Sequence, residues 1–331
     1  MTNIDHDALE ELLRHASPRP VPSQEDQAAA REAVREEWRN VASKRQTRLR
    51  VTRFAIAATV LIGVFAGLNA YRAPVAEAVQ VATILKSIGP VYLLGEQAEL
   101  RETDDLSNIV SGQTIVTGDD AGLALAWGNG GSLRIDENSR IEFTDDVSVF
   151  LEQGRVYFDS LPPSILTEVD TQDAPVFALH TEFGQIQHLG TQYMSEVDSG
   201  TLIVSVREGE VSVDGKFYDK RVLSGQQATI SGRQQPNILS ISRSGEAWNW
   251  VNRTTPPVDV EGKTLHAFLS WASRELGLEL QYEPAAASEA RKSVLVGTID
   301  KEPAVAMPLW VASAGLDWQI HEGVIHIYRK P

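Results

Sequence analysis

The chain has 331 residues, of which 42% are hydrophobic and 23% are charged, and this balance excludes a wholly disordered protein and a polytopic membrane protein. Lys and Arg number 30 against 45 Asp and Glu, so the net charge of −15 disfavours nucleic acid as a partner. The sequence contains no cysteine, which excludes disulfides, thiolate metal sites and a cysteine nucleophile.

Residues 1–53 predict two short amphipathic helices separated by prolines. So short a segment with few large apolar groups does not readily bury a core alone. We therefore expect its apolar stripes to contact a partner; the alternative is that the two helices only pack on each other as a membrane-proximal stub. Trp38 is the strongest candidate anchor, because Trp is common among interface hot spots. The predicted contact residues are Leu9, Leu12, Leu13, Val34, Trp38 and Val41.

Residues 54–71 form an uncharged run of 18 residues that predicts one transmembrane helix. At about 1.5 Å per residue the run spans roughly 27 Å, close to the thickness of a hydrocarbon core. A buried core helix and a cleaved signal peptide are the alternatives, but 53 residues precede the run, more than a signal peptide has. Basic residues cluster just before it, which predicts a cytoplasmic N-terminus and a C-terminus across the inner membrane, in the bacterial periplasm.

Residues 72–245 predict a β domain, because short apolar stretches alternate with polar residues between Gly, Asn and Asp clusters. This pattern is typical of a two-sheet sandwich, a roll or a solenoid. The Asn129-Gly130-Gly131 cluster predicts a turn between two strands. Two similar stretches, at 151–156 and 206–211, each place a glycine, Gly154 or Gly209, between an outgoing and a returning strand, where a positive φ is expected.

An ordered series of motifs runs across about residues 80–245. The motifs are Thr117-Gly118, Gly122-Leu123-Ala124-Leu125, Gly130-Gly131-Ser132-Leu133, Leu151 with Gly154-Arg155-Val156-Tyr157-Phe158-Asp159, Leu189-Gly190-Thr191-Gln192-Tyr193, Val206 with Glu208-Gly209 and Val211, and Leu223 with Gly225-Gln226. This series resembles the FecR family. The resemblance implies cytoplasmic helices that hold a sigma factor, one membrane span and a periplasmic β domain.

The pair Gly190-Thr191 is the one reactive candidate in the sequence. Some FecR-like proteins cleave themselves at a Gly–Thr bond, where the Thr hydroxyl attacks the preceding carbonyl, so the resemblance implies that Thr191 is a nucleophile. The alternative is a tight turn that uses a small residue. No base for Thr191 is identifiable from the sequence.

Residues 246–331 predict a separate small α+β domain after the linker at Pro256-Pro257. A helical stripe from Leu265 ends at Gly277, and a second helix opens at Pro303, each followed by alternating strands. The pattern resembles the STN domain, the short domain of secretins and TonB-dependent receptors. A terminal strand at an exposed edge accepts a partner strand, and the alternative is a covered strand. The predicted receptor-binding edge comprises Val324, His326 and Tyr328.

Together these features predict a mostly β, single-pass anti-sigma factor of the inner membrane. The resemblance implies that it relays a periplasmic signal from a TonB-dependent outer-membrane receptor to an extracytoplasmic-function (ECF) sigma factor, with envelope proteases, in the uptake of iron or another nutrient. The alternative is a membrane-anchored periplasmic binding or scaffold module without a transcriptional partner. No enzyme motif, metal site or cofactor site is identifiable, so we expect no enzymatic activity, metal or cofactor.

Overall fold

The structure is a computed structural model that describes residues 14, 23–25, 28–29, 31–32, 35, 79–94, 100–102, 107–161, 177–188 and 190–330. Contacts divide the chain into two compact units, Met1–Ala76 and Glu77–Pro331. In the first unit the described residues between 24 and 35 are helical and exposed, as the second predicted helix requires. The six predicted sigma-contact residues and the predicted span at 54–71 lie outside the described residues. No helix among the described residues is long and apolar enough to cross a membrane.

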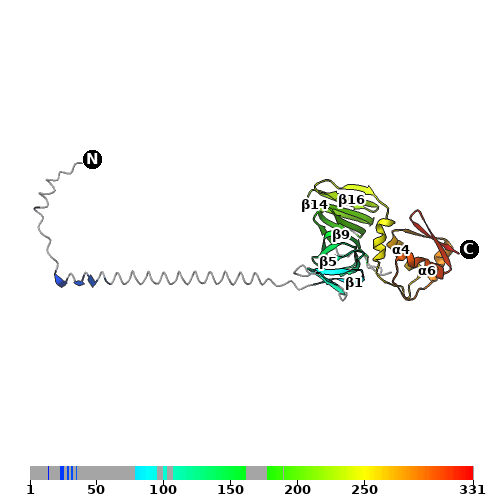
Figure 1. Cartoon of the computed structure of the whole chain (residues 1–331), viewed down its shortest axis with the longest axis horizontal. Coiled ribbons are helices and arrows are strands. Elements are labelled where there is room, and N and C mark those ends of the chain that lie inside the picture. Colours follow the sequence, from blue (N-terminus) through cyan, green and yellow to red (C-terminus); the bar gives the residue numbers. More distant parts are fainter. Residues whose placement is uncertain are drawn as a thin grey trace. The chain divides into compact units, whose positions relative to one another are not determined.

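Most of the second unit is β-structure (Figure 1), which confirms the prediction of a mostly β chain for the described residues. One hydrogen-bonded network joins seventeen described strands. The strands are β1 (Gln80–Ile88), β2 (Val91–Leu94), β3 (Leu100–Glu102), β4 (Asn108–Val110), β5 (Thr114–Thr117), β6 (Gly122–Trp127), β7 (Ser132–Ile135), β8 (Arg140–Phe143), β9 (Ser148–Asp159), β10 (Ala178–Thr181), β11 (Gly184–His188), β12 (Gln192–Asp198), β13 (Thr201–Glu208), β14 (Glu210–Gly215), β15 (Tyr218–Leu223), β16 (Gln226–Ser231) and β17 (Asn237–Ser240).

The strand pairs fall into two groups that share β9. One group runs β4-β1-β6-β7-β9-β12-β13-β16-β17, and the other runs β3-β2-β5-β8-β9-β10-β11-β14-β15. Neighbours are antiparallel except β9 and β10, which are parallel. Alternate residues of most of these strands meet in one shared apolar core.

Strand β9 corrects one sequence expectation. The sequence predicted two strands that turn back at Gly154, whereas β9 is one continuous strand of 12 residues. Its first half pairs with β8, and its second half, from Gly154 onward, pairs with β7 and β12. Gly154 has a φ of +92°, and a Cβ there would lie 2.4 Å from the Cα of Ser139. The glycine therefore marks the point where the strand passes from one group to the other, without reversing. Gly209 lies between β13 and β14, as expected.

The C-terminal part follows a short connector and has its own apolar core. The connector is η2 (Glu246–Trp248) with α3 (Asn249–Arg253). The remaining elements are β18 (Val258–Asp259), α4 (Leu265–Leu276), β19 (Glu279–Tyr282), α5 (Pro284–Lys292), β20 (Thr298–Ile299), α6 (Pro303–Ser313), β21 (Leu316–His321) and β22 (Val324–Arg329). Strands β18 and β20 pair with each other, and the other three form a sheet in the order β19-β22-β21.

The boundaries of α4 follow from local sequence. The Thr264 hydroxyl accepts a hydrogen bond from the Ala267 N–H and caps the first turn, and Gly277 ends the helix in the left-handed region, as predicted. Pro303 opens α6 at a first-turn position, also as predicted. Helix α5 was not predicted from the sequence, and the strand after it, β20, is only two residues long.

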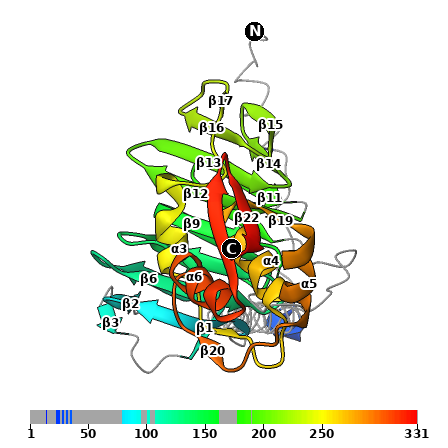
Figure 2. The ribbon, with the colours of Figure 1, turned by 90° about the vertical axis from the view of Figure 1, so that its right-hand side faces the viewer.

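The predicted receptor-binding edge at Val324, His326 and Tyr328 is wrong as an edge. These residues lie in β22, which is the central strand of its sheet, parallel to β19 and antiparallel to β21. Figure 2 shows β22 beside β19 near the C-terminus. Because both neighbours already use the backbone groups of β22, a partner strand cannot add to it. The edges of this sheet are β19 and β21.

We predict that Gly154→Ala lowers the free energy of unfolding by about 2 kcal/mol or more, because alanine there meets both a positive φ and the Ser139 backbone. Gly130→Ala is the matched control: Gly130 has a φ of +104° but nothing within 4 Å of an added Cβ. Gly130→Ala should lower the free energy of unfolding by only about 1 kcal/mol. Denaturant unfolding of both variants measures the difference, and equal costs would contradict the steric argument.

Candidate functional site

The outer faces of four adjacent strands are buried where the C-terminal part meets the β domain. In the stretches 132–135, 156–159, 192–195 and 204–207 every residue is buried, so both faces of β7, β9, β12 and β13 are covered. Their inward residues belong to the apolar core. Their outward residues contact η2, α3 and α4, and Figure 2 shows α3 alongside β9 and β12. We call this contact the ionic joint, formed by Arg134, Asp136, Arg155, Asp159 and Arg207 from the β domain and by Arg253, Arg274 and Glu275 from the C-terminal side.

The most buried ion pair of the joint links β7 to α4. An Nη2 of Arg134 lies 2.8 Å from an Oε2 of Glu275, and these side chains are 1% and 6% exposed. The Nη1 of Arg134 also donates to the Val251 carbonyl at 2.9 Å and to the Thr255 hydroxyl at 3.2 Å. The two terminal nitrogens of this buried guanidinium thus face a carboxylate and two further acceptors, whereas either charged partner alone would be a costly buried charge.

A second pair links the end of β9 to α4. The carboxylate of Asp159 accepts both terminal nitrogens of Arg274, with Nη2 to Oδ1 at 2.7 Å, and it also accepts the Gln192 amide at 2.9 Å. Arg274 further contacts the exposed Glu208 at 3.4 Å. Burial by itself lowers the pKa of Arg274, but the Asp159 carboxylate outweighs burial and raises that pKa above its ordinary value. Arg274 is therefore a permanent cation that holds α4 against β9.

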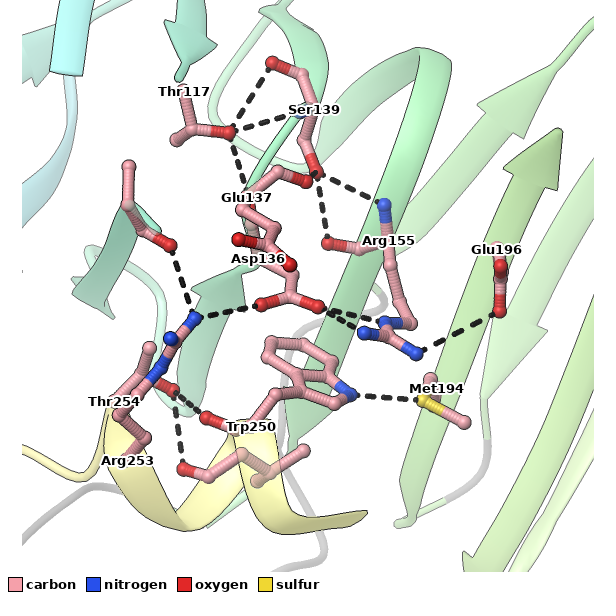
Figure 3. Close-up of polar contacts among 12 residues, drawn as sticks. Thr117, Asp136, Glu137, Ser139, Arg155, Met194, Glu196, Trp250, Arg253 and Thr254 are labelled. Carbon is pink, nitrogen blue, oxygen red and sulfur yellow. Dashed lines mark hydrogen bonds and ion pairs between the residues drawn. The ribbon is translucent and has the colours of Figure 1, made fainter. Parts of the chain in front are cut away.

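A third carboxylate, Asp136, connects β9 to α3. It accepts the Nε of Arg155 at 2.8 Å and a second nitrogen of the same guanidinium, and on its other side the Nη2 of Arg253 lies 3.5 Å away (Figure 3). The Trp250 ring lies 5.2 Å from the Arg155 guanidinium, and its indole N–H donates to the sulfur of Met194 (Figure 3). Asp136 thus joins a strand and the connector helix through one buried side chain.

An aromatic cluster fills the centre of the joint. Tyr157 and Met194 from the strands pack against Trp248, Trp250 and Val251 of the connector. This apolar cluster is separate from both domain cores. Its Tyr157 ring lies 5.5 Å from the Arg134 guanidinium. The low polarity there strengthens the attraction between Arg134 and Glu275 and raises the cost of an unpaired charge.

The predicted cleavage pair lies at a tightly packed turn. Gly190 has a φ of +67°, and a Cβ on Gly209 would lie 2.6 Å from the Gly190 carbonyl oxygen. Thr191 is fully buried, and its hydroxyl has no hydrogen-bond partner within the described part of the chain. The motif at 189–193 and the motif at 206–211 therefore meet here. Because no base contacts the hydroxyl in this arrangement, self-cleavage at this bond remains a prediction.

His188 is buried among aromatic rings two residues before Gly190. Its Nε2 accepts the Phe177 N–H at 3.3 Å, and the Phe158 ring lies 4.7 Å away. Burial lowers the pKa of His188 from 6.5 to about 4, and the nearby Asp159 opposes this only in part. The imidazole is therefore neutral at physiological pH. Across the described ranges, no group of three or more His, Asp or Glu side chains is arranged to hold a metal ion.

The surface is hollowed near Gly154 and again on the C-terminal part. An acidic hollow of about 510 Å³ is lined by Glu137, Glu152, Glu182, Glu196 and Asp198 near Gly154. On the C-terminal part, α6 and β20 line a mostly apolar groove of about 480 Å³. Leu309 lies in this groove with 61% of its surface exposed. An exposed apolar groove of this kind is typical of a protein contact.

The ionic joint was not anticipated from the sequence. Arg155 appeared in the sequence analysis only as a member of a motif. Arg134 and Arg207 each follow an apolar neighbour in an alternating pattern, which is typical of an outward residue on a half-exposed strand. Burial of that outer face depends on the C-terminal part, some 70 to 140 residues further along the chain. A local pattern does not carry this information.

Comparison with known proteins finds a family match for one region of the chain. Residues 113–212 match the FecR protein family. The FecR-matching region covers less than a third of the chain and includes the β-domain side of the ionic joint together with Gly190-Thr191. A comparison with curated proteins finds no match. Two crystal structures, at 1.65 and 2.50 Å, of a protein from Parabacteroides distasonis ATCC 8503 that is provisionally assigned as an anti-sigma factor each share 18% identity. They cover 66% of this chain and 99% of theirs, with a TM-score of 0.33.

We predict that Arg134→Met lowers the free energy of unfolding by about 3–5 kcal/mol, because it leaves Glu275 buried without a counter-charge. The control, Arg140→Met, breaks an exposed pair with Glu152 and should cost at most about 1 kcal/mol. The double variant Arg134→Met/Glu275→Met should recover part of the loss. Denaturant unfolding measures all three, and an Arg134→Met cost as small as the control's would refute the buried pair's role.

We predict that His188 contributes to acid sensitivity. As pH falls, the unfolded His188 takes up a proton near pH 6.5, whereas the folded form does so only near 4, so the unfolded state binds more protons between these values and stability falls. Between pH 7 and 4.5 the wild type should lose about 2–3 kcal/mol more stability than His188→Gln. Exposed His321→Gln is the control. Equal acid sensitivity in all three proteins would contradict the assignment.

Proposed function

We propose that the chain is a FecR-type regulator that is anchored in the inner membrane. In this proposal residues 1–53 hold an ECF sigma factor in the cytoplasm, residues 54–71 cross the membrane, and the unit Glu77–Pro331 receives a signal in the periplasm. The match of residues 113–212 to the FecR family is the observation that carries the proposal. The apolar run and the basic residues before it support the topology.

The ionic joint suggests how the second unit acts. Its ion pairs tie α3 and α4 to the strands that the FecR match includes. A partner that binds the C-terminal part therefore acts on the β domain as well, because moving one against the other separates buried charges. A partner shifts such an equilibrium only by the difference in its affinity for the two arrangements.

We further propose that the input is the signalling domain of a TonB-dependent outer-membrane receptor, in the uptake of iron or another nutrient. Its contact on this chain is the apolar groove between α6 and β20, where Leu309 and Trp310 offer an apolar surface. Release of the sigma factor then proceeds through envelope proteases. The edges of the small sheet, β19 and β21, each have one strand neighbour within the described part of the chain, and a sheet edge is where a partner strand adds.

The proposal predicts capture of a sigma factor by the full-length chain and loss of that capture in Trp38→Ala. Arg35→Ala is the matched control, because Arg35 is an exposed residue of the same predicted helix. Tagged full-length protein is isolated from induced and uninduced cells, and bound sigma factors are identified by mass spectrometry. Leu309→Glu should capture normally and fail to release on induction, because a charge then lies in the apolar groove.

Failure of the wild-type chain to capture any sigma factor would refute this function and favour the scaffold alternative. Normal release from Leu309→Glu would refute the groove as the input contact and leave the sigma contact intact.

A further inference from the structure

Arg207 is the one member of the ionic joint whose guanidinium has no carboxylate partner among the described residues. It is 1% exposed and lies at the end of β13. Its Nη1 donates to the Glu275 carbonyl at the end of α4, at 2.8 Å, and its guanidinium lies 4.2 Å from the Trp248 ring. A helix C-terminus and an aromatic face each offer partial negative charge, but neither is a full counter-charge.

One edge of this guanidinium is free. The Nε and Nη2 of Arg207 have no hydrogen-bond partner within the described part of the chain, and the neighbouring Tyr157 hydroxyl does not meet hydrogen-bond geometry. On Arg155 the same two nitrogens both donate to the carboxylate of Asp136. Arg155 thus shows that this edge of a guanidinium takes a carboxylate as its ligand.

Arg207 also lines a small pocket. Arg243 and Arg274 line it as well, together with Ser273 and Gly277, and its volume is about 90 Å³. That is room for about three water molecules, or for one small oxyanion. Gly277 lets the backbone pass close to Arg207, because a Cβ there would meet the Arg243 carbonyl and would lie 2.9 Å from the Nε of Arg207.

The charges around the pocket favour an anion. Within the joint, Arg134 is neutralised by Glu275 and Arg274 by Asp159, which leaves Arg207 as an additional buried cation. An arginine does not lose its proton in a protein, although burial lowers the pKa of Arg207. The two other acidic side chains at the rim, Glu208 and Glu279, are more than half exposed and contact Arg274 and Arg243.

We propose that this pocket binds a small oxyanion, a carboxylate or a phosphate group, seated on the Nε and Nη2 of Arg207 with Arg243 at the rim. The bound group gives Arg207 a counter-charge and therefore stabilises the attachment of α4 to the β domain. The inference does not depend on the sigma factor or on the receptor.

Isothermal titration of the full-length chain with sodium acetate and with sodium phosphate, at ionic strength fixed by sodium chloride, tests the site. Saturable binding is expected for at least one anion, with a rise in the unfolding midpoint. Tighter acetate binding identifies a carboxylate ligand, and tighter phosphate binding identifies a phosphate ligand. No saturable heat with either anion would overturn the proposal.

Variants separate this pocket from other basic surfaces. Arg207→Lys keeps the charge but removes the two-nitrogen edge and should abolish binding. Arg243→Gln leaves the buried joint intact, since its side chain is 46% exposed, and should weaken binding about tenfold. Arg221→Gln, at an arginine 72% exposed on β15, is the control and should bind as the wild type does. Wild-type affinity in Arg243→Gln would overturn the assignment even if Arg207→Lys does not fold.

Discussion

Buried charge at the contact between the β domain and the C-terminal part is the constraint on which the second unit depends. Arg134, Glu275 and Asp159 are buried, so each of these charges is tolerable only while its partner is present, and Arg274, the partner of Asp159, is 25% exposed. Such pairs add little to stability beyond what well-packed apolar groups would add. Their effect is on specificity, because a displaced α4 would leave buried charges unpaired.

The strands that carry these charges are held in place by the two-group arrangement of the β domain. Strand β9 belongs to both groups and brings Arg155, Tyr157 and Asp159 to one outer face. The passage at Gly154 makes this possible, because a strand that reversed there would not reach β7 and β12. The polar outer face and the apolar inner face are therefore consequences of the same continuous strand.

The sequence predicted what local patterns determine and missed what distant contacts determine. Strands such as Leu123–Trp127, the Asn129-Gly130-Gly131 turn and the end of α4 at Gly277 were predictable from alternation and from glycine conformation. The continuity of β9 and the central position of β22 were not predictable, because the sequence of a strand does not say which other strand pairs with it. The joint was missed for the same reason: an alternating strand with Arg134 on its outer face looks half-exposed until another part of the chain covers it.

The matched charges also limit how the C-terminal part evolves. An apolar residue at the position of Glu275 would leave Arg134 buried without its counter-charge, whereas Arg207 would keep its backbone acceptor. A C-terminal part taken from another protein would therefore need an acidic residue at this position to fit the β domain. A chimaera made from two such proteins should exchange the outer face of β7, β9 and β13 together with the helices that cover it.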